Sequence, residues 1–367
     1  RLPQEAPAGF LLTASHSDSP CFRLRDHAEL TGEYIRLSAE RYGGMINDSW
    51  LDRPLSVAGR VLVRREGGLE ARLVDLKRDV ALIPRVAIHL NRETNNGVKY
   101  DPARDLVALY AAGTGSGSFY REVARTADCA PEDVVAGDLV LYNNQPGTVW
   151  GPEGEFVSAP RLDDLACVFA CTEGFLTAQE RDMVPVLCVF DNEEIGSETK
   201  QGAASVFLPE TLAAISEALG LSAADHRALL ADSMMLSCDN GHARHPNHPE
   251  LADTNEAPVP NGGVVVKHSP RYATDGVSAA VFTELCRRTE VPVQHYANRP
   301  DQMGGATLGN IADTKLPIPT VDIGMAQLAM HSCFETMGSR DVETFVRAVR
   351  ACYESSLRFM PEGVALR

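Results

Sequence analysis

Hydrophobic runs alternate with polar clusters along much of the chain. Apolar residues recur at intervals of three and four over Leu165 to Gln179 and over Val342 to Phe359, which predicts two helices. Short continuous runs are typical of buried strands, and each one ends just before a polar cluster. These four runs are Phe10 to Ala14, Val184 to Phe190, Met234 to Ser237 and Ile318 to Ile323. The pattern predicts an α/β core whose strand ends border a single site.

Residues 26–155 have a different pattern, with short alternating strands and Gly-rich turns. The clearest signal is a hairpin, in which Val61-Leu62-Val63 and the run from Leu69 to Leu76 flank Glu66-Gly67-Gly68. We therefore expect a β-rich domain at 26–155, inserted into a catalytic domain that comprises 1–25 and 156–367. The Gly-rich run from Gly113 to Ser118 lacks a strong strand, a lysine or a helix start beside it, so we interpret it as a flexible loop and not as a phosphate loop.

Composition narrows the class of protein. The 367 residues include 50 Asp plus Glu and 34 Lys plus Arg, and the resulting net charge of -16 repels phosphate backbones and anionic membrane surfaces. No run approaches the ~20 apolar residues that span a bilayer. We therefore expect neither nucleic acid nor membrane as a partner. The chain has nine cysteines, an odd number that cannot pair completely in disulfides, and several of them lie in apolar runs such as Leu187-Cys188-Val189. Both observations favour a reducing, cytoplasmic compartment.

Two polar clusters contain candidate metal ligands, and each of these residues could instead have an ordinary structural role. His16 and Asp18 follow the first strand, and a carboxylate that accepts a proton from one ring nitrogen fixes the tautomer of a metal-bound histidine. His16 is also compatible with an ordinary loop histidine. Asp163-Asp164 stands at the start of a predicted helix, where one carboxylate could be an N-cap or a bridging metal ligand.

The run Asp191-Asn192-Glu193-Glu194 follows the most hydrophobic strand. Three carboxylates at a buried strand end require nearby cations, because repulsion and desolvation would otherwise destabilise their charged forms. Of the adjacent pair, one glutamate could bind metal while the other takes a proton from metal-bound water. The alternative is a solvated acidic loop.

Two later clusters complete a set of two imidazoles and three carboxylates. The set is His16, Asp163, Glu194, Asp239 and His331. Mixed nitrogen and oxygen donors of this kind suit Zn²⁺ and also admit Mn²⁺ or Co²⁺. A separate zinc site at His242, His245 and His248 is the weaker interpretation, since closely spaced loop histidines more often contact substrate or solvent.

In content and order these motifs resemble the aspartyl aminopeptidase family. The matching segments run through nearly the whole chain: Ala14 to Pro20, Pro160 to Leu165, Asp191 to Ser197, Asp239 to Asn247, Lys267 to Thr274 and Met330-His331-Ser332. The resemblance implies a mixed-sheet dimetal exopeptidase core with two divalent ions per subunit, most simply zinc. It also implies a homododecamer, in which the β-rich insert offers strand edges that another subunit could cover.

The resemblance assigns roles to the ligands. Asp163 would bridge the two ions, with His16 and Asp239 completing one site and Glu194 and His331 the other.

It also implies the reaction. Asp18 would orient His16, and Glu193 would be the general base in metal-assisted attack of water on the first peptide bond, which releases an N-terminal Asp or Glu. A related dimetal deacylase or carboxypeptidase, or an aminopeptidase that prefers neutral residues, remains an alternative. A non-catalytic shell protein is hard to reconcile with the presence of every ligand together with Glu193.

Substrate contacts are expected at four further residues. A local cation must offset the net charge of -16 if the substrates are acidic, and the resemblance assigns this role to Lys267, with Arg271 in reserve. The alternative is a lysine whose stem covers apolar surface while its amine reaches water. His245 is expected to contact substrate. His89 matches a family histidine that reaches a neighbouring subunit's active site, and its bland interpretation is a histidine on an apolar strand.

Overall fold

A computed structural model describes residues 3, 6–113, 115–179, 181–302 and 304–367. The chain divides into two compact units. An α/β unit comprises Arg1–Ser19, Gly147–Met330 and Glu335–Arg367, and a β-rich unit comprises Pro20–Pro146 and His331–Phe334. The predicted fold class, an α/β core with a β-rich insert, is confirmed.

The α/β unit is built on a six-stranded mixed sheet with the strand order β11-β1-β12-β16-β14-β15. The strands are β1 (Phe10–His16), β11 (Val184–Phe190), β12 (Met234–Cys238), β14 (Val264–His268), β15 (Val293–Ala297) and β16 (Thr320–Gly324). β1 pairs in parallel with β11 and β12, and β12 with β16, while β14 runs antiparallel to β16. The carboxyl ends of β1, β11 and β12 therefore meet at one edge of the sheet, as the polar clusters predict.

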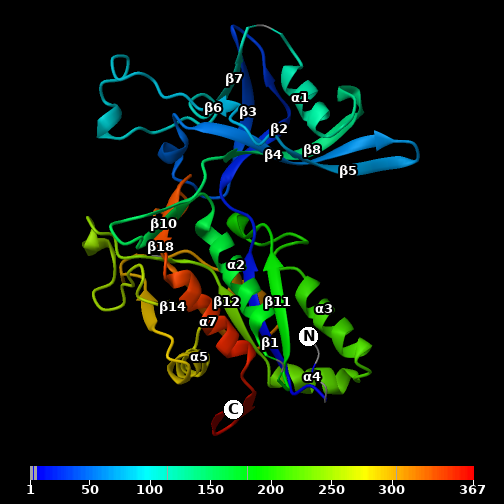
Figure 1. Ribbon diagram of the computed structural model, residues 1–367, viewed down its shortest axis with the longest axis vertical. Coiled ribbons are helices and arrows are strands. Elements are labelled where there is room, and N and C mark those ends of the chain that lie inside the picture. The colour runs from blue at the N-terminus through cyan, green and yellow to red at the C-terminus, as the bar shows by residue number, and fades with distance from the viewer. Residues whose placement is uncertain (1–2, 4–5, 114, 180, 303) are drawn as a thin grey trace. The chain divides into compact units, whose positions relative to one another are not determined.

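Helices cover both faces of this sheet, with a hydrophobic cluster under each layer (Figure 1). One layer consists of α2 (Leu162–Thr177), α5 (Gly276–Arg288) and α7 (Asp341–Tyr353). The other consists of α3 (Phe207–Ala218), α4 (Ala223–Ala231) and α6 (Leu308–Asp313). In α7 the buried Phe345, Val349 and Cys352 recur at four and three residues, which places one apolar stripe on the core.

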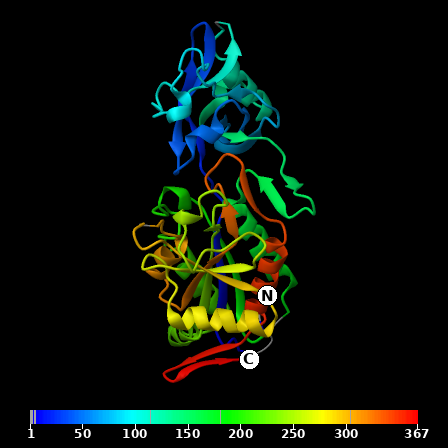
Figure 2. The same cartoon turned by 90° about the vertical axis from the view of Figure 1, so that its left-hand side faces the viewer.

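The predicted C-terminal helix is shorter than expected. α7 ends at Tyr353, and the residues that follow form a hairpin of β19 (Leu357–Met360) and β20 (Gly363–Leu366), drawn in red in Figure 2. Ser355 Oγ donates to the carbonyl of Cys352 at 2.7 Å where the helix stops. Leu357 packs into the core and Phe359 against it, so the apolar pattern there has the two-residue period of a strand.

A smaller five-stranded sheet lies in the same unit, in the order β13-β17-β18-β10-β9. Its strands are β9 (Thr148–Trp150), β10 (Phe156–Ala159), β13 (Gly241–His242), β17 (Ala326–Leu328) and β18 (Glu335–Gly338). Two 3-10 helices also belong to this unit, η4 (Glu193–Ile195) and η5 (Pro249–Leu251).

The β-rich unit is a seven-stranded sheet in the order β5-β4-β6-β7-β3-β2-β8. Its elements are β2 (Cys21–Leu30), β3 (Tyr34–Tyr42), η1 (Asn47–Trp50), β4 (Pro54–Arg65), β5 (Gly68–Asp75), β6 (Ala81–Leu82), η2 (Thr94–Asn96), β7 (Ala108–Ala112), α1 (Ser118–Thr126), η3 (Pro131–Asp133) and β8 (Val134–Asn143). β4 pairs with β8 as well as with β6, so the sheet closes into a ring around its own core. The predicted hairpin is present as β4 and β5.

The Gly-rich run at 113–118 has more regular surroundings than predicted. β7 ends just before Gly113 and α1 begins at Ser118; Thr114 lies outside the described residues. The carboxylate of Glu29 accepts the backbone N–H groups of Gly117 and Phe119 at the helix start. The expectation that no strand or helix start flanks this run is therefore wrong, and the N–H groups at the helix start bond a protein carboxylate.

The unit boundaries differ from the expected 26 and 155. β2 already begins at Cys21, and β9 pairs with β10 of the α/β unit. The segment 331–334 joins the β-rich unit, where the backbone of Cys333 accepts from Asn143 Nδ2 at 3.0 Å and donates to Ser49 Oγ at 2.9 Å. Among the described helices, none has the length and apolar content needed to cross a membrane.

Candidate metal centre

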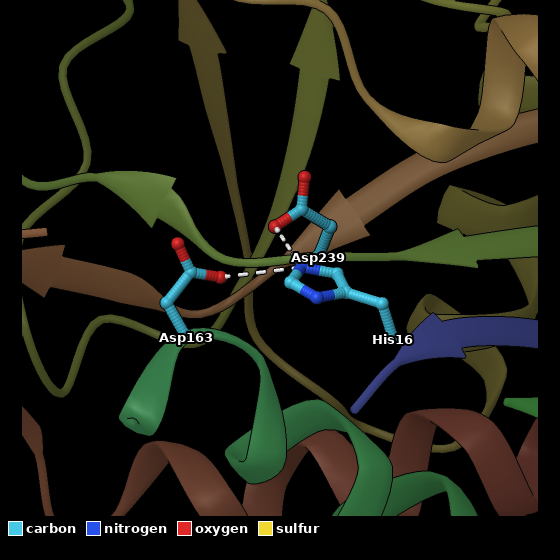
Figure 3. A group of neighbouring side chains, drawn as sticks. All are labelled: His16, Asp163 and Asp239. Carbon is cyan, nitrogen blue, oxygen red and sulfur yellow. Dashed lines mark ion pairs between the residues drawn. The ribbon is translucent and has the colours of Figure 1, made fainter. Parts of the chain in front are cut away.

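Three predicted ligands from separate elements of the α/β unit converge (Figure 3). His16 ends β1, Asp163 lies at the start of α2, and Asp239 follows β12. His16 Nε2 lies 3.7 Å from Asp163 Oδ1 and 3.9 Å from Asp239 Oδ1. All three side chains are buried, and their candidate ligand atoms lie within 4.8 Å of one another. An imidazole nitrogen and two carboxylate oxygens at this spacing can bind one divalent ion.

Asp18 connects this group to the acidic turn after β11. Its Oδ1 lies 3.3 Å from His16 Nδ1. The same carboxylate accepts the backbone N–H of Glu193 at 3.1 Å and that of Glu194 at 3.1 Å. Asn192, with φ 62°, turns the chain into η4 so that both N–H groups face Asp18. The backbone carbonyl of Asp18 also lies 3.1 Å from His16 Nδ1, so Asp18 contacts the imidazole through both groups while its carboxylate holds the backbone of both glutamates.

The Asp163-Asp164 pair lies at a kink in the first turn of α2. The N-cap residue of α2 is Arg161, which makes no side-chain cap hydrogen bond, and both aspartates have non-helical backbone angles. The bond between them is a cis peptide. Glu335 Oε2 accepts the backbone N–H of Asp163 at 3.0 Å, and Asp164 Oδ2 accepts that of His16 at 3.2 Å. Asp164 Oδ2 therefore bonds the backbone of β1, and the N-cap and metal-ligand interpretations of the pair both stay predictions.

The second predicted group is only partly contained in the α/β unit. Ligand oxygens of Asp163 and Glu194 lie within 4.8 Å of each other. His331 belongs to the β-rich unit, where its backbone carbonyl accepts from the N–H of Ile46 at 3.0 Å. Its place in a second metal site therefore stays a prediction from the sequence.

Buried acidic groups dominate the electrostatics of the site. Burial raises the pKa of Glu193 to about 7, and the charge of Asp239 adds to the effect. Burial likewise raises the pKa of Asp164 well above its usual range. Burial lowers the pKa of His16, but hydrogen bonds to Asp163 and Asp18 outweigh it and leave that pKa raised. A solvated acidic loop does not fit these residues, whereas divalent cations, which would displace the protons, do.

Lys267 lies at this centre and is already engaged by protein oxygens. Its side chain is buried, and Nζ donates to the carbonyl of Asp239 at 2.8 Å, to Asp239 Oδ2 at 3.3 Å and to the carbonyl of Asn240 at 3.3 Å. These contacts use the three donors of an ammonium group. Burial lowers the pKa of Lys267, and the charge of Asp239 more than offsets it, so the pKa is raised. The alternative of a lysine that reaches solvent is wrong.

The segment after Asp239 also lines a cavity of about 320 Å³. The lining residues of this cavity include His242, His245, Gly304 and Gly305. Arg271 is exposed, and its Nη1 donates to the carbonyl of Gly304 at 3.0 Å. His245 thus lines this cavity and Arg271 contacts the lining residue Gly304, while a substrate contact at either residue stays a prediction.

His89 lies in an exposed turn of the β-rich unit, so its interpretation as a histidine on an apolar strand is wrong. Asn240 was not predicted as a site residue, and its Nδ2 donates to the carbonyl of Leu162 at 2.9 Å and to Gln327 Oε1 at 2.7 Å. Asn240 therefore ties the segment of Asp239 to the start of α2. Its position next to a predicted ligand is the one signal that could have indicated this role.

A family model described as aminopeptidase I zinc metalloprotease (M18) matches residues 3–353. A relative named "Probable M18 family aminopeptidase 2", from Clostridium acetobutylicum, is 41% identical over 348 residues, which are 92% of this chain and 80% of the relative.

Two solved structures share the fold at 30% sequence identity. A crystal structure of prApe1 has a TM-score of 0.90 and is matched over 96% of this chain and 81% of its own. A structure of the mApe1 dodecamer from S. cerevisiae has a TM-score of 0.82, over 96% of this chain and 82% of its own.

Proposed function

The chain belongs to the M18 family, the aspartyl aminopeptidase family of zinc metallopeptidases, and we propose that it releases acidic residues from peptide N-termini. Its membership makes it a metal-dependent aminopeptidase. One observation carries the proposal. His16, Asp163 and Asp239 converge in a buried group, and the Glu193-Glu194 turn is hydrogen-bonded to the carboxylate that orients His16.

Five residues would hold two divalent ions, most simply zinc. Asp163 would be shared, with His16 and Asp239 on one ion and Glu194 and His331 on the other. When bound, such ions lower the pKa of water and polarise a substrate carbonyl.

The chain's own contribution to the reaction is proton transfer. Glu193 takes the proton of the attacking water and delivers it to the leaving amine. In the metal-free chain, burial raises the pKa of Glu193 to about 7, and bound divalent ions would lower it, so the support for this role is the place of Glu193 in the turn that Asp18 holds. Asp18 holds the backbone of Glu193 in place during both transfers.

The acidic preference rests on Lys267. With a net charge of -16, the protein needs a local cation to accept an acidic side chain. Two of the three Lys267 contacts go to backbone carbonyls, and the third goes to Asp239 Oδ2 at 3.3 Å. We infer that a substrate carboxylate replaces this third contact, since Asp239 then serves as a metal ligand.

The test compares catalytic efficiency on matched peptides with N-terminal Asp, Glu, Ala and Leu. In Lys267→Met, cleavage of the Asp and Glu peptides should fall by roughly thirtyfold or more, since losing one partner of a buried charged pair costs ~2-5 kcal/mol. The exposed Lys315→Met is the matched control. An equal loss on all four peptides, together with reduced zinc content, would show that Lys267 only supports Asp239.

Blocked substrates separate the rival activities. An aminopeptidase cleaves peptides with a free α-amine, whereas a deacylase hydrolyses N-acetylated substrates and a carboxypeptidase requires a free C-terminal carboxylate. Cleavage of the N-acetylated Asp peptide in preference to the free one would count against the proposal. Loss of activity on chelation, restored by zinc, would exclude a non-catalytic shell protein.

We also propose a homo-oligomer, most simply a dodecamer, in which His89 reaches a neighbouring subunit's active site. The mApe1 dodecamer and the exposed position of His89 support this assembly. A cytoplasmic location remains part of the proposal. All nine cysteines are free thiols, and seven of them are buried.

A further inference from the structure

The carboxylate of Asp322 is a buried anion to which the proposed reaction assigns no role. Asp322 lies in the middle of β16, in register with Ser237 of β12, and its side chain is 0% exposed. A charge in such a position is retained only when hydrogen bonds replace the water that it loses. The hydrogen-bond partners of Asp322 therefore indicate the role of this carboxylate in the structure.

Four donors converge on its two oxygens. Oδ1 accepts from Ser237 Oγ at 2.8 Å and from Thr307 Oγ1 at 2.6 Å. Oδ2 accepts from the backbone N–H groups of Ala273 at 2.7 Å and of Thr274 at 3.3 Å. An ionised carboxylate offers about four acceptor sites and no donor, so it matches this set, whereas an amide would turn an NH₂ group toward two of the donors.

The contact with Thr274 is reciprocal. The backbone N–H of Asp322 donates to Thr274 Oγ1 at 2.8 Å. The segment 269–275 that is held in this way connects β14 to α5 and carries Arg271 and Tyr272. The ring centroid of Tyr272 lies 5.5 Å from Lys267 Nζ. Asp322 thus fixes the segment that packs against the proposed specificity lysine.

Thr307 connects a second segment to the same carboxylate. It is the N-cap residue of α6 and follows Gly304 and Gly305, which line the cavity. Arg271 Nη1 donates to the carbonyl of Gly304. Arg271 and Gly304 therefore join the two segments to each other, while Thr274 and Thr307 join them to Asp322.

We propose that Asp322 is a positioning residue for substrate recognition. It holds the segment 271–274 and the cavity wall at 304–307 in a fixed register against the sheet, and so sets the shape of the site around Lys267. The inference rests on the proposed function, because the site it shapes is the one assigned above to the N-terminal acidic residue.

Gly309 supports the same assignment by its packing. A Cβ added to Gly309 would lie 2.5 Å from Asp322 Oδ1 and 2.5 Å from Ser237 Oγ. The variant Gly309→Ala should therefore displace the Asp322 carboxylate without changing its charge. It offers a second route to the same disturbance.

The experiment measures KM, kcat and zinc content of the zinc-loaded full chain on whichever of the Asp, Glu, Ala and Leu peptides the parent cleaves best. Asp322→Asn should raise KM by about tenfold, the effect typical of a lost hydrogen bond to a charged group, with zinc content unchanged. Gly309→Ala and Thr307→Val should shift KM in the same direction. Thr307→Ser, which keeps the hydroxyl donor, should restore the parent KM.

A matched control distinguishes positioning from general stability. Asp341 is another buried carboxylate of this unit, and it accepts the backbone N–H groups of Asn261 at 2.6 Å and Gly263 at 3.1 Å. Asp341→Asn should lower the melting temperature and leave KM unchanged. Equal changes of KM in Asp322→Asn and Asp341→Asn, an unchanged KM in Asp322→Asn, or a loss of zinc from it would overturn the inference.

Two further outcomes are also decisive. If Asp322→Asn fails to fold, the Thr307→Val and Thr307→Ser pair decides, because equal KM values in these two variants contradict the assignment. A parent chain that cleaves the Leu peptide better than the Asp peptide contradicts the acidic preference, while the KM series still tests Asp322 on the Leu peptide.

Discussion

Asp18 Oδ1 lies 3.3 Å from His16 Nδ1, while His16 Nε2 faces the carboxylates of Asp163 and Asp239. An acceptor on one side of an imidazole keeps the proton there and leaves the other nitrogen for a metal ion. In the proposed metal site, this pairing would orient His16 as a ligand once an ion displaces the proton on Nε2.

Asp18→Asn should weaken zinc binding by about 10- to 100-fold, the usual cost of removing a partner of a metal-bound histidine. Competition with a chromophoric chelator would measure the change. The exposed Asp26→Asn is the matched control, because it removes one charge without touching the site. An unchanged zinc affinity in Asp18→Asn would contradict the orienting role.

Glu193→Gln should lower kcat by about 10²- to 10⁴-fold, since the variant cannot take a proton from water. Zinc content should equal that of the parent. Glu194→Gln should instead lose zinc. The reverse pattern, with metal loss and partial activity in Glu193→Gln, would show that the roles of the two glutamates are exchanged.

The stability of the metal-free protein should fall as the pH rises from 5 to 8. The pKa of Glu193 is raised from 4.5 to about 7 in the folded chain, so the folded state binds this proton more tightly than the unfolded state does. That contribution to stability is lost as the pH rises through about 7, and the raised pKa of His16 acts in the same direction.

Melting temperatures of chelator-treated protein at pH 5 and pH 8 would measure this effect. Zinc should restore the stability at pH 8, because metal binding releases the same protons. Glu193→Gln should flatten the dependence. A metal-free protein that becomes more stable toward pH 8 would contradict the prediction.

His89→Ala should lower turnover in the assembled protein if the imidazole acts in a neighbouring active site. Mixed assemblies of His89→Ala and Glu193→Gln subunits should then recover activity, because some sites combine an intact His89 with an intact Glu193. Activity assays after co-refolding would measure the recovery. Activity no higher than the sum of the two separate variants would place His89 outside the neighbour's site.

The sequence predicted the parts of the fold that depend on local patterns. The strands β1 and β11 were predicted because their apolar runs end at polar clusters, and predicted metal ligands lie at those strand ends. The end of α7 was misplaced because Leu357 and Phe359 fit a helical spacing as well as a strand. The partners of Lys267 could not be predicted, since Nζ reaches Asp239 across 28 residues of sequence and no local pattern encodes that contact.

The division of the chain at 331–334 limits how the protein can be recombined. The α/β unit is interrupted twice, once by Pro20–Pro146 and once by His331–Phe334. A deletion of the long insert alone would strip the short segment of the residues that bind its backbone, Ile46, Ser49 and Asn143. A chimera that takes the insert from one relative must therefore take the short segment from the same parent. The β-rich unit thus consists of two segments that must be exchanged together, and the shorter one carries a predicted metal ligand.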